Sequence, residues 1–488
     1  MVDSDKQSIE HEEHIPVISK IGYGFAQTGN NLLSGLGVGV IDIFYLKFTG
    51  LDPRLMGISW LIFAVWNAIN DPLIGIIEDR TKSKLGRRMP YLRYGSFIYV
   101  ASFILIWFPF TNEPGLLFWN HLLMLFIFDT VYSMIGLITY SLPAEMALTQ
   151  KERASIMLYA AGIGLIGIFV PLALPLLYLG ENPNLEGFRI AMIIVGFIAG
   201  AMIYFSSYVI KENKYTVMEQ SLGFFESIKE TFKNKPFLIL EITIFSTVIM
   251  QNIITGYLVF VTDYLIDLNF RDTVNLVITV FLFTLLIFGI VWVVKNIPKY
   301  GVKKMTIYGL FIAAIGFILL FLMGVSLQPN QANKLSLSTG LGPLILVIIG
   351  VIVMTLTNQP LMADAIDFDE TLTGKRRETT YSGVNALITK PAVSIGRAIF
   401  LFIIKAYGYV SAGVGEIAPK PLEQPESVAE GVLIAFCVVS TICLLIASFA
   451  LRYFPLDGPE WLKKKRELQE VHKMKEEKYM EWLKKQRQ

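Results

Sequence analysis

The chain is poor in the residues that build disulfides, metal centres and nucleotide sites. Only 2 cysteines and 4 histidines occur among its 488 residues. Cys437 and Cys443 lie six residues apart in one apolar run and the histidines are scattered, so no group has metal-ligand spacing. No Gly-x-x-x-x-Gly-Lys-Ser/Thr phosphate loop is present, and no nucleophile is accompanied by a base. The sequence therefore predicts no cofactor, no metal site, no nucleic-acid partner and no enzymatic activity.

Charged residues are also scarce. They make up 17% of the chain, against 54% hydrophobic and 13% aromatic residues, which is more apolar surface than a water-soluble fold buries. A bilayer core of about 30 Å requires about 20 apolar residues per helix. The sequence therefore predicts an all-α polytopic membrane protein with 12 transmembrane helices. The expected spans are residues 21–48, 55–78, 91–111, 116–145, 154–178, 187–210, 236–265, 273–294, 303–324, 341–365, 379–408 and 428–453.

The distribution of charge predicts how the chain is oriented in the membrane. No cleavable signal peptide is expected, because the first twenty residues are polar and contain no apolar stretch. With a cytoplasmic N-terminus, 33 of the 42 lysines and arginines fall in cytoplasmic segments and seven on the outer side. Positive residues concentrate on the cytoplasmic side of membrane proteins. We therefore expect an integral protein of the cell membrane with both termini in the cytoplasm.

Two similar polar segments indicate that the chain consists of duplicated halves. LPAEMALTQKERASI follows the fourth span and LMADAIDFDETLTGKRRE follows the tenth, with acids and bases in the same order. The expected organisation is a cytoplasmic N-terminus (1–20), an N-terminal six-helix bundle (21–210), a cytoplasmic linker (211–235), a C-terminal six-helix bundle (236–453) and a charged cytoplasmic tail (454–488). We expect the tail to form a solvated or surface-lying helix, with binding of lipid headgroups or a partner by Lys464, Lys465 and Arg466 as the alternative.

Four ionisable residues within the expected spans stand out: Asp71, Asp129, Lys390 and Arg397. An ionised side chain near mid-bilayer costs at least ~2.5–3.5 kcal/mol on insertion scales, so it is expected to face a cavity or a partner. For Asp71 and Lys390 we favour a functional role. For Asp129 and Arg397 a structural ion pair that joins two helices is an equal alternative.

The segment WNAINDPLIGIIEDRTKSKLGRRMPYL carries a family resemblance. Its GIIEDRTKSKLGRR part resembles the major facilitator signature between the second and third helices. The whole segment, together with YGFAQTGNN, SLPAEMALTQKERASI and RRETTYSGVNALITK, is similar to the glycoside-pentoside-hexuronide:cation symporter family, to which the melibiose carrier belongs. The resemblance implies a major facilitator fold and alternating-access symport of a sugar or sugar derivative, a small-molecule substrate, coupled to H⁺ or Na⁺.

The resemblance also implies a cation-coupling site. The family's coupling carboxylate and its essential lysine correspond to Asp71 and Lys390. Asn67 and Asn70 share the helix of Asp71, and Asn67 lies four residues before it on the same face. Members that use sodium carry a second carboxylate at the position of Asn67, so its loss favours H⁺ coupling or uncoupled transport.

The substrate site implied by the resemblance is altered. Positions that carry sugar-binding residues in the melibiose carrier are occupied by Asn31, Gly136, Tyr140 and Ala161. A different pocket is therefore expected. Its candidate substrate-binding residues are Asn30, Asn31, Asp129, Tyr132, Tyr140, Asn358, Gln359, Asn385 and Arg397.

Charged residues near the cytoplasmic helix ends predict a gate, in which ion pairs hold the inner side closed and release when the halves rock. The alternative is that the bases only set the topology, which does not explain the interleaved acids. The candidate gating residues are Asp79, Arg80, Arg87, Arg88, Glu145, Arg153, Asp364, Asp367, Arg376, Arg377 and Glu378.

Two other functions remain open at this point. The lost carboxylates and the bases Lys390 and Arg397 suit a carrier of a lipid-like or organic-anion solute. A non-transporting membrane sensor or scaffold that retains the fold is the second alternative, with the charged tail as its working part.

Overall fold

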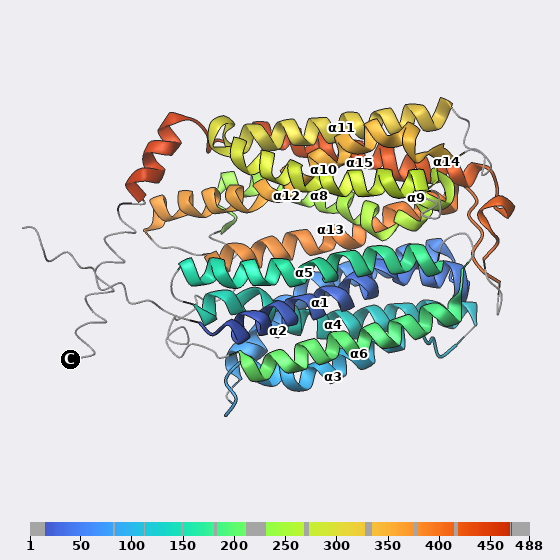
Figure 1. Cartoon of the computed structure of the whole chain (residues 1–488), viewed down its shortest axis with the longest axis horizontal. Helices are drawn as coiled ribbons and strands as arrows, with labels where there is room; N and C mark the ends of the chain where they lie inside the picture. Colours follow the sequence, from blue (N-terminus) through green and yellow to red (C-terminus); the bar gives the residue numbers. More distant parts are fainter. Residues whose placement is uncertain are drawn as a thin grey trace, which may run out of the picture. The chain divides into compact units, whose positions relative to one another are not determined.

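The computed structural model shows an almost entirely helical protein (Figure 1). It describes residues 15–81, 83–111, 113–147, 150–179, 183–210, 231–267, 273–326, 334–374, 378–413, 418–468 and 470. Within these residues the chain forms fourteen α-helices and two strands of two residues each. The predicted N-terminal segment up to residue 14, the linker from 211 to 230 and the tail beyond residue 470 lie outside the described residues.

The chain divides into two compact units, which we call unit 1 and unit 2. Unit 1 comprises residues up to 52, 69–221 and 411–418, and unit 2 comprises the remainder. The units therefore exchange short segments, since residues 53–68 group with unit 2. The bundles predicted at 21–210 and 236–453 stay a prediction.

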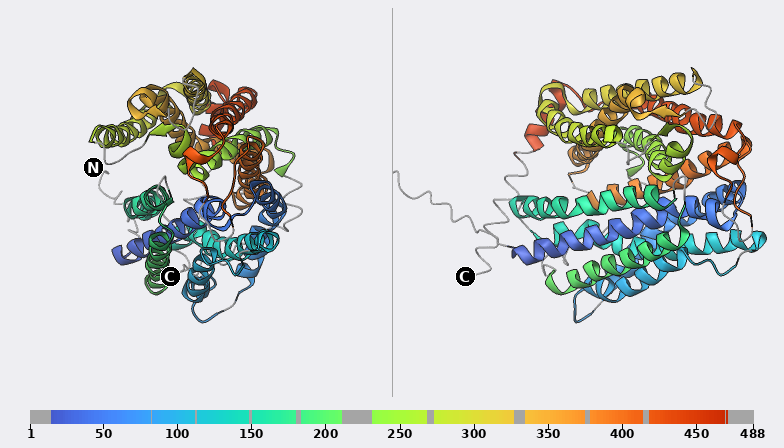
Figure 2. Two further views of the ribbon diagram at one scale, coloured as in Figure 1. Left: turned by 90° about the vertical axis from the view of Figure 1, so that its right-hand side faces the viewer. Right: turned by 45° about the vertical axis from the view of Figure 1, so that its right-hand side comes forward.

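Unit 1 is a bundle of long helices. In Figures 1 and 2 these helices, coloured blue to green, lie side by side, and α1 packs against α4, α5 and α6. Its elements are α1 (Val17–Phe44), a π-helix (Tyr45–Thr49), the second part of α2 (Pro53–Arg80), α3 (Met89–Ile106), α4 (Pro114–Met146), α5 (Gln150–Leu179) and α6 (Leu185–Val209).

Unit 2 is a second helical bundle, in which α8 packs against α12, α13 and α15, and α11 packs against α12 and α15. Two very short strands pair in parallel, with Ile266 opposite Leu335. Its elements after α2 are α8 (Lys235–Gly256), α9 (Leu258–Tyr264), β1 (Ile266–Asp267), α10 (Thr273–Tyr300), α11 (Val302–Ser326), β2 (Leu335–Ser336), α12 (Leu337–Thr373), α13 (Glu378–Ala406), a 3₁₀ turn (Pro421–Glu423), α14 (Ser427–Leu433), a π-helix (Ile434–Val438) and α15 (Val439–Arg452).

The helices match the hydrophobic runs of the sequence. Among the described residues, 10 helical stretches are long and apolar enough to cross a membrane. The two other predicted spans, 55–78 and 273–294, coincide with α2 and α10. Every predicted span is therefore helical, and the prediction of an all-α polytopic membrane protein is confirmed.

Side-chain caps and glycines define several helix ends. The amide oxygens of Asn184 and Asn234 accept hydrogen bonds from the backbone N–H groups three residues later, at 2.9 Å and 3.1 Å, which satisfies donors that a helix start leaves open. The π-helix after α1 ends at Gly50, which has a φ of 83°. A Cβ atom at Gly50 would also lie 2.4 Å from the carbonyl oxygen of Ala412, so only glycine fits this position.

The described start of the C-terminal tail contacts unit 2. Residues 459–468 are helical, and Trp461 is buried with its ring 6.3 Å from that of Phe368 on α12. Lys465 forms an ion pair with Asp364 of the same helix. The predicted solvated or surface-lying helix is therefore anchored, over these residues, by one aromatic and one ionic contact.

Candidate functional site

The central part of α2 concentrates polar side chains inside the bundle. Asn67 and Asn70 are buried, and Asp71 is half-buried. Pro72 follows directly inside the helix and cannot donate to the carbonyl oxygen of Ala68, four residues earlier. A carboxylate, two amides and a released backbone carbonyl thus lie within about one turn of α2, as the sequence predicts for the coupling site.

In unit 1, Asn70 connects α2 to α4. Its amide nitrogen donates to the Asp129 carboxylate at 2.9 Å, to the Asp129 carbonyl oxygen at 3.2 Å and to the Ser133 hydroxyl at 3.0 Å. All three residues are buried. The structure therefore brings the predicted coupling residue Asn70 and the predicted substrate residue Asp129 into one network.

A second polar group of unit 1 surrounds Gly136 on α4. The Tyr99 hydroxyl donates to the Asn30 amide oxygen at 3.3 Å. A Cβ at Gly136 would lie 3.7 Å from the Tyr132 ring and 3.9 Å from the Asn30 amide nitrogen. Gly136 therefore lies close to two predicted substrate residues, and a Cβ there would make ordinary contacts with both.

Two further predicted substrate residues of unit 1 have different surroundings. Asn31 is half-buried, and its Cβ lies close to Gly167 of α5, at 3.0 Å from where a Cβ at that glycine would be. Tyr140 on α4 is 67% exposed, so within unit 1 it does not join the buried network around Asn70.

In unit 2, the first part of α2 packs along α13. The Asn67 amide donates to the Lys390 carbonyl oxygen at 3.2 Å. Lys390 is half-buried and precedes Pro391, which lies inside α13. Each candidate coupling residue, Asp71 and Lys390, is thus followed by a proline that releases a helix carbonyl group.

Arg397 lies seven residues after Lys390 on α13 and is 1% exposed. Its guanidinium carbon lies 4.9 Å from the Trp60 ring centre, and a Cβ at Gly256 would be 3.2 Å from the same carbon. The Tyr257 hydroxyl donates to its carbonyl oxygen at 3.2 Å. These contacts favour a structural role of Arg397, in which it joins α13 to neighbouring helices, over the predicted contact with substrate.

Asn385 lies next to an acid that the sequence analysis did not single out. One position of its amide group lies 3.1 Å from Oε1 and 3.3 Å from Oε2 of Glu241 on α8. Glu241 falls within the predicted span 236–265, so the rule that selected Asp71 also applies to it. The two other predicted substrate residues on this side, Asn358 and Gln359 of α12, are half-buried and exposed.

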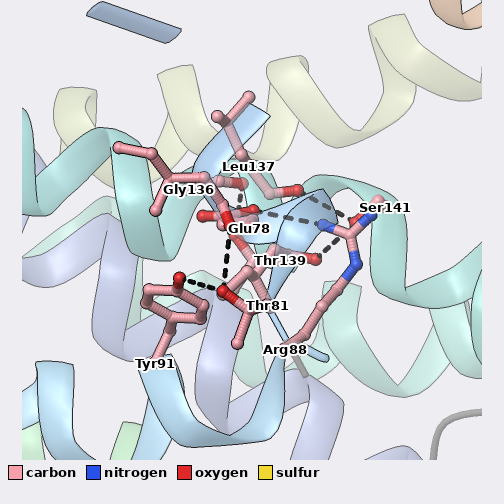
Figure 3. Close-up of polar contacts among 10 residues, drawn as sticks. Glu78, Thr81, Arg88, Tyr91, Gly136, Leu137, Thr139 and Ser141 are labelled. Carbon is pink, nitrogen blue, oxygen red and sulfur yellow. Dashed lines mark hydrogen bonds and ion pairs between the residues drawn. The ribbon is translucent and has the colours of Figure 1, made fainter. Parts of the chain in front are cut away.

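Two predicted gating residues of unit 1, Arg88 and Arg153, donate hydrogen bonds to groups of the same unit. The Arg88 guanidinium, shown turned toward Glu78 in Figure 3, donates to that carboxylate at 3.3 Å. Thr81 and Tyr91 join their hydroxyl groups at 2.6 Å beside this pair. Arg153 donates to the Ala147 carbonyl oxygen at 2.8 Å, at the end of α4.

The structure describes the side chains of only some of the other predicted gating residues. Arg87 is half-buried. Asp367 is buried on α12, three residues after Asp364. Arg376 and Arg377, and the side chains of Asp79, Arg80, Glu145 and Glu378, lie outside the described part of the structure.

Two buried contacts between ionisable groups of unit 1 were not predicted from the sequence. Lys20 on α1 pairs with Glu152 on α5 at 2.8 Å. Asp42 on α1 and His121 on α4 are fully buried and lie 3.7 Å apart. Asp42 lies inside the predicted span 21–48, which was a sufficient signal to find it, whereas its partner follows only from packing.

Comparison with known proteins establishes the family. The family model described as MFS/sugar transport protein matches residues 22–458. The chain belongs to this family of the major facilitator superfamily. It is therefore an integral membrane transporter and not an enzyme, and its resemblance to the glycoside-pentoside-hexuronide group is confirmed.

Individual members of this family align along most of the chain. The uncharacterized symporter YnaJ of Bacillus subtilis (strain 168) is 24% identical, covering 95% of this chain and 97% of YnaJ. The isoprimeverose transporter of Lactiplantibacillus pentosus is 22% identical, covering 83% of each chain. The crystal structure of a D-xylose-proton symporter superposes with a TM-score of 0.62 at 13% identity, over 90% of this chain and 96% of that one, which shows the shared fold.

Proposed function

We propose that the protein is a symporter that moves a sugar or sugar derivative together with H⁺ or Na⁺ by alternating access. The observation that carries the proposal is the buried network of Asn70, Asp129 and Ser133, one residue from Asp71 on a helix interrupted by Pro72. Amide and hydroxyl groups recognise polyols, and an intramembrane carboxylate is the usual site of cation coupling. The name of the isoprimeverose transporter supports a sugar substrate.

The proposal places the protein in the cell membrane with both termini in the cytoplasm. Asp71 binds the coupling cation, and Lys390 is the second ionisable residue that coupling requires. H⁺ is favoured over Na⁺, because Asn67 offers an amide and not a second carboxylate. Asn30 and Tyr132, which both lie close to Gly136, are then the first candidates for sugar contacts.

Transport by the purified protein in liposomes tests this function. A panel of glycosides, pentoses and uronates is added, and the external pH and the Na⁺ dependence of uptake are recorded. We expect one sugar to make the medium more alkaline, and Asp71→Asn to abolish accumulation while exchange of that sugar across the membrane continues. Glu460→Gln, which removes an exposed acid of the tail, serves as the matched control.

Three results contradict the proposal in different ways. If folded protein gives no signal with any sugar but takes up an organic anion or a lysolipid, the alternative carrier is correct. If Asp71→Asn still accumulates sugar against a gradient, coupling does not depend on Asp71. Absence of counterflow and of ligand-dependent thermal shifts with every compound would identify a non-transporting sensor.

A further inference from the structure

Glu241 is a buried acid that the proposed coupling site does not use. It lies in the second turn of α8, inside the candidate span Lys235–Gly256, and is 2% exposed. In the part of the chain that the structure describes, no lysine, arginine or histidine forms an ion pair with it. Placing an uncompensated charge in such an environment is costly, and acids inside spans are therefore usually functional.

Asn385 gives both charge states of Glu241 a partner. One position of its amide group lies 3.1 Å and 3.3 Å from the two carboxyl oxygens. With the amide nitrogen at this position, Asn385 donates to the carboxylate; with the amide oxygen there, it accepts from the protonated acid. A rotation of one amide thus accommodates gain or loss of a proton without breaking an ion pair.

Helices α8 and α13 pack against each other before and after the position of the carboxyl–amide pair. On one side, the rings of Phe237 and Tyr381 lie 4.8 Å apart at 89°, and Asn234 donates to the Tyr381 hydroxyl at 2.9 Å. On the other side, Gly396 allows a backbone approach, since a Cβ there would lie 2.9 Å from the Ile249 carbonyl oxygen. The pair therefore lies in a packed site.

Other ionisable groups lie on the elements that pack against α8. Protonation of these groups must be distinguished from protonation of Glu241. On α13, Lys390 lies five residues beyond Asn385. Among the side chains that the structure describes, the remaining ionisable groups of these elements are Tyr381, Arg397 and Lys405 on α13, Asp364, Asp367, Asp369 and Glu370 on α12, Asp263 and Tyr264 on α9, Cys437 in the π-helix before α15, and Cys443 and Arg452 on α15.

We propose that Glu241 is a second proton-binding site of the transport cycle, positioned by Asn385. The proposal rests on the proposed symport function and extends it to unit 2. The carboxylate takes one proton from water on one side of the membrane and releases it to water on the other, so that no further reactant is required. Asn385 is a positioning residue, because it acts only through the carboxyl group.

Infrared spectroscopy of the reconstituted protein tests this site without a substrate. Difference spectra between acidic and alkaline buffer report the carbonyl stretch of a protonated carboxylic acid. We expect the wild type to show, besides any band from Asp71, a band that Asp71→Asn keeps and Glu241→Gln loses. Asp263→Asn, which neutralises another fully buried acid of unit 2, is the matched control and is expected to retain the band.

Asn385→Ala provides the second variant. We expect it to keep the band but to shift its frequency and its pH midpoint, because the carboxyl group loses its amide partner. If Glu241→Gln leaves every carboxyl band of the wild type unchanged, or if the band assigned to Glu241 disappears in Asp263→Asn instead, the proposal is overturned. A wild-type protein without any pH-dependent carboxyl band also overturns it.

Transport then separates the two proposals. If a sugar is found with the liposome panel, Glu241→Gln is expected to lower the number of protons moved per sugar while sugar exchange continues. Normal proton coupling in this variant contradicts a role of Glu241 in the cycle. The infrared result does not depend on the sugar, so failure of the panel leaves the test of Glu241 intact.

Discussion

Glu152 and Glu78 of unit 1 are held differently from Glu241 of unit 2. In unit 1, Glu152 pairs with Lys20 at 2.8 Å, and Glu78 pairs with Arg88 at 3.3 Å. In unit 2, Glu241 has the neutral amide of Asn385 beside it. Removing one partner of a buried ion pair leaves an uncompensated charge, whereas an acid beside an amide can change protonation without that penalty.

This contrast separates acids that fix helices from an acid suited to carry a proton. The ion pairs of unit 1 connect α1 with α5 and α2 with the segment before α3. Glu241 lies in a seam whose packing comes from rings and a glycine contact. We therefore expect a larger loss of stability from breaking the Lys20–Glu152 pair of unit 1 than from disturbing a close helix contact of unit 2.

The largest effect is expected from Lys20→Met. The substitution leaves Glu152 buried without its ammonium partner, which destabilises the protein by about 3–5 kcal/mol. Thermal unfolding in detergent measures the loss as a lower Tm. The double variant Lys20→Met/Glu152→Gln is the control and is expected to recover most of it, because no buried charge remains unpaired. Equal Tm values for wild type and Lys20→Met would show that the Lys20–Glu152 pair does not stabilise the protein.

An intermediate effect is expected from Gly350→Ala in unit 2. A Cβ at Gly350 would lie 2.4 Å from both the Gly309 carbonyl oxygen and the Ala313 Cβ, in the seam between α11 and α12. Such overpacking costs about 1–3 kcal/mol. Gly342→Ala on the same helix is the matched control, since a Cβ there meets no atom within 4 Å. Similar Tm values for the two variants would show that the contact between α11 and α12 at Gly350 accommodates a methyl group.

The smallest effect is expected from Lys465→Met. Its partner Asp364 is buried, but the Lys465 side chain is 34% exposed, and partly exposed ion pairs contribute about 0–1 kcal/mol. Thermal unfolding is again the measurement, with the exposed neighbour Lys464→Met as control. A loss as large as that of Lys20→Met would show that unit 2 also depends on an ion pair, and would weaken the contrast.

Several elements of the site followed from local sequence alone. The position of Asp71 within an apolar run, with Asn67 four residues before it, predicts polar groups on one helical face. The structure has α2 over these residues, with Asn67 and Asn70 buried. The link between Asn70 and Asp129, 59 residues apart, was beyond sequence reasoning, because periodicity describes one helix and not its neighbour.

Glu241 was not predicted from the sequence, for a different reason. Its place in an apolar run was visible, and only its surroundings decide whether it is a structural or a functional acid. Asn385 lies 144 residues later in the sequence and reaches Glu241 through the packing of α13 on α8. The same holds for His121, which meets Asp42 from another helix.

The sequence by itself determined the membrane location, the helical spans and the family, because lipid requires long apolar helices and the charged loop motifs are local. The tertiary structure decided which buried charges have partners: Lys20 with Glu152, Arg88 with Glu78, and the amide of Asn385 with Glu241. The reason is that the electrostatic cost of a buried charge depends on the groups within a few ångströms, and these groups come from helices far apart in the chain.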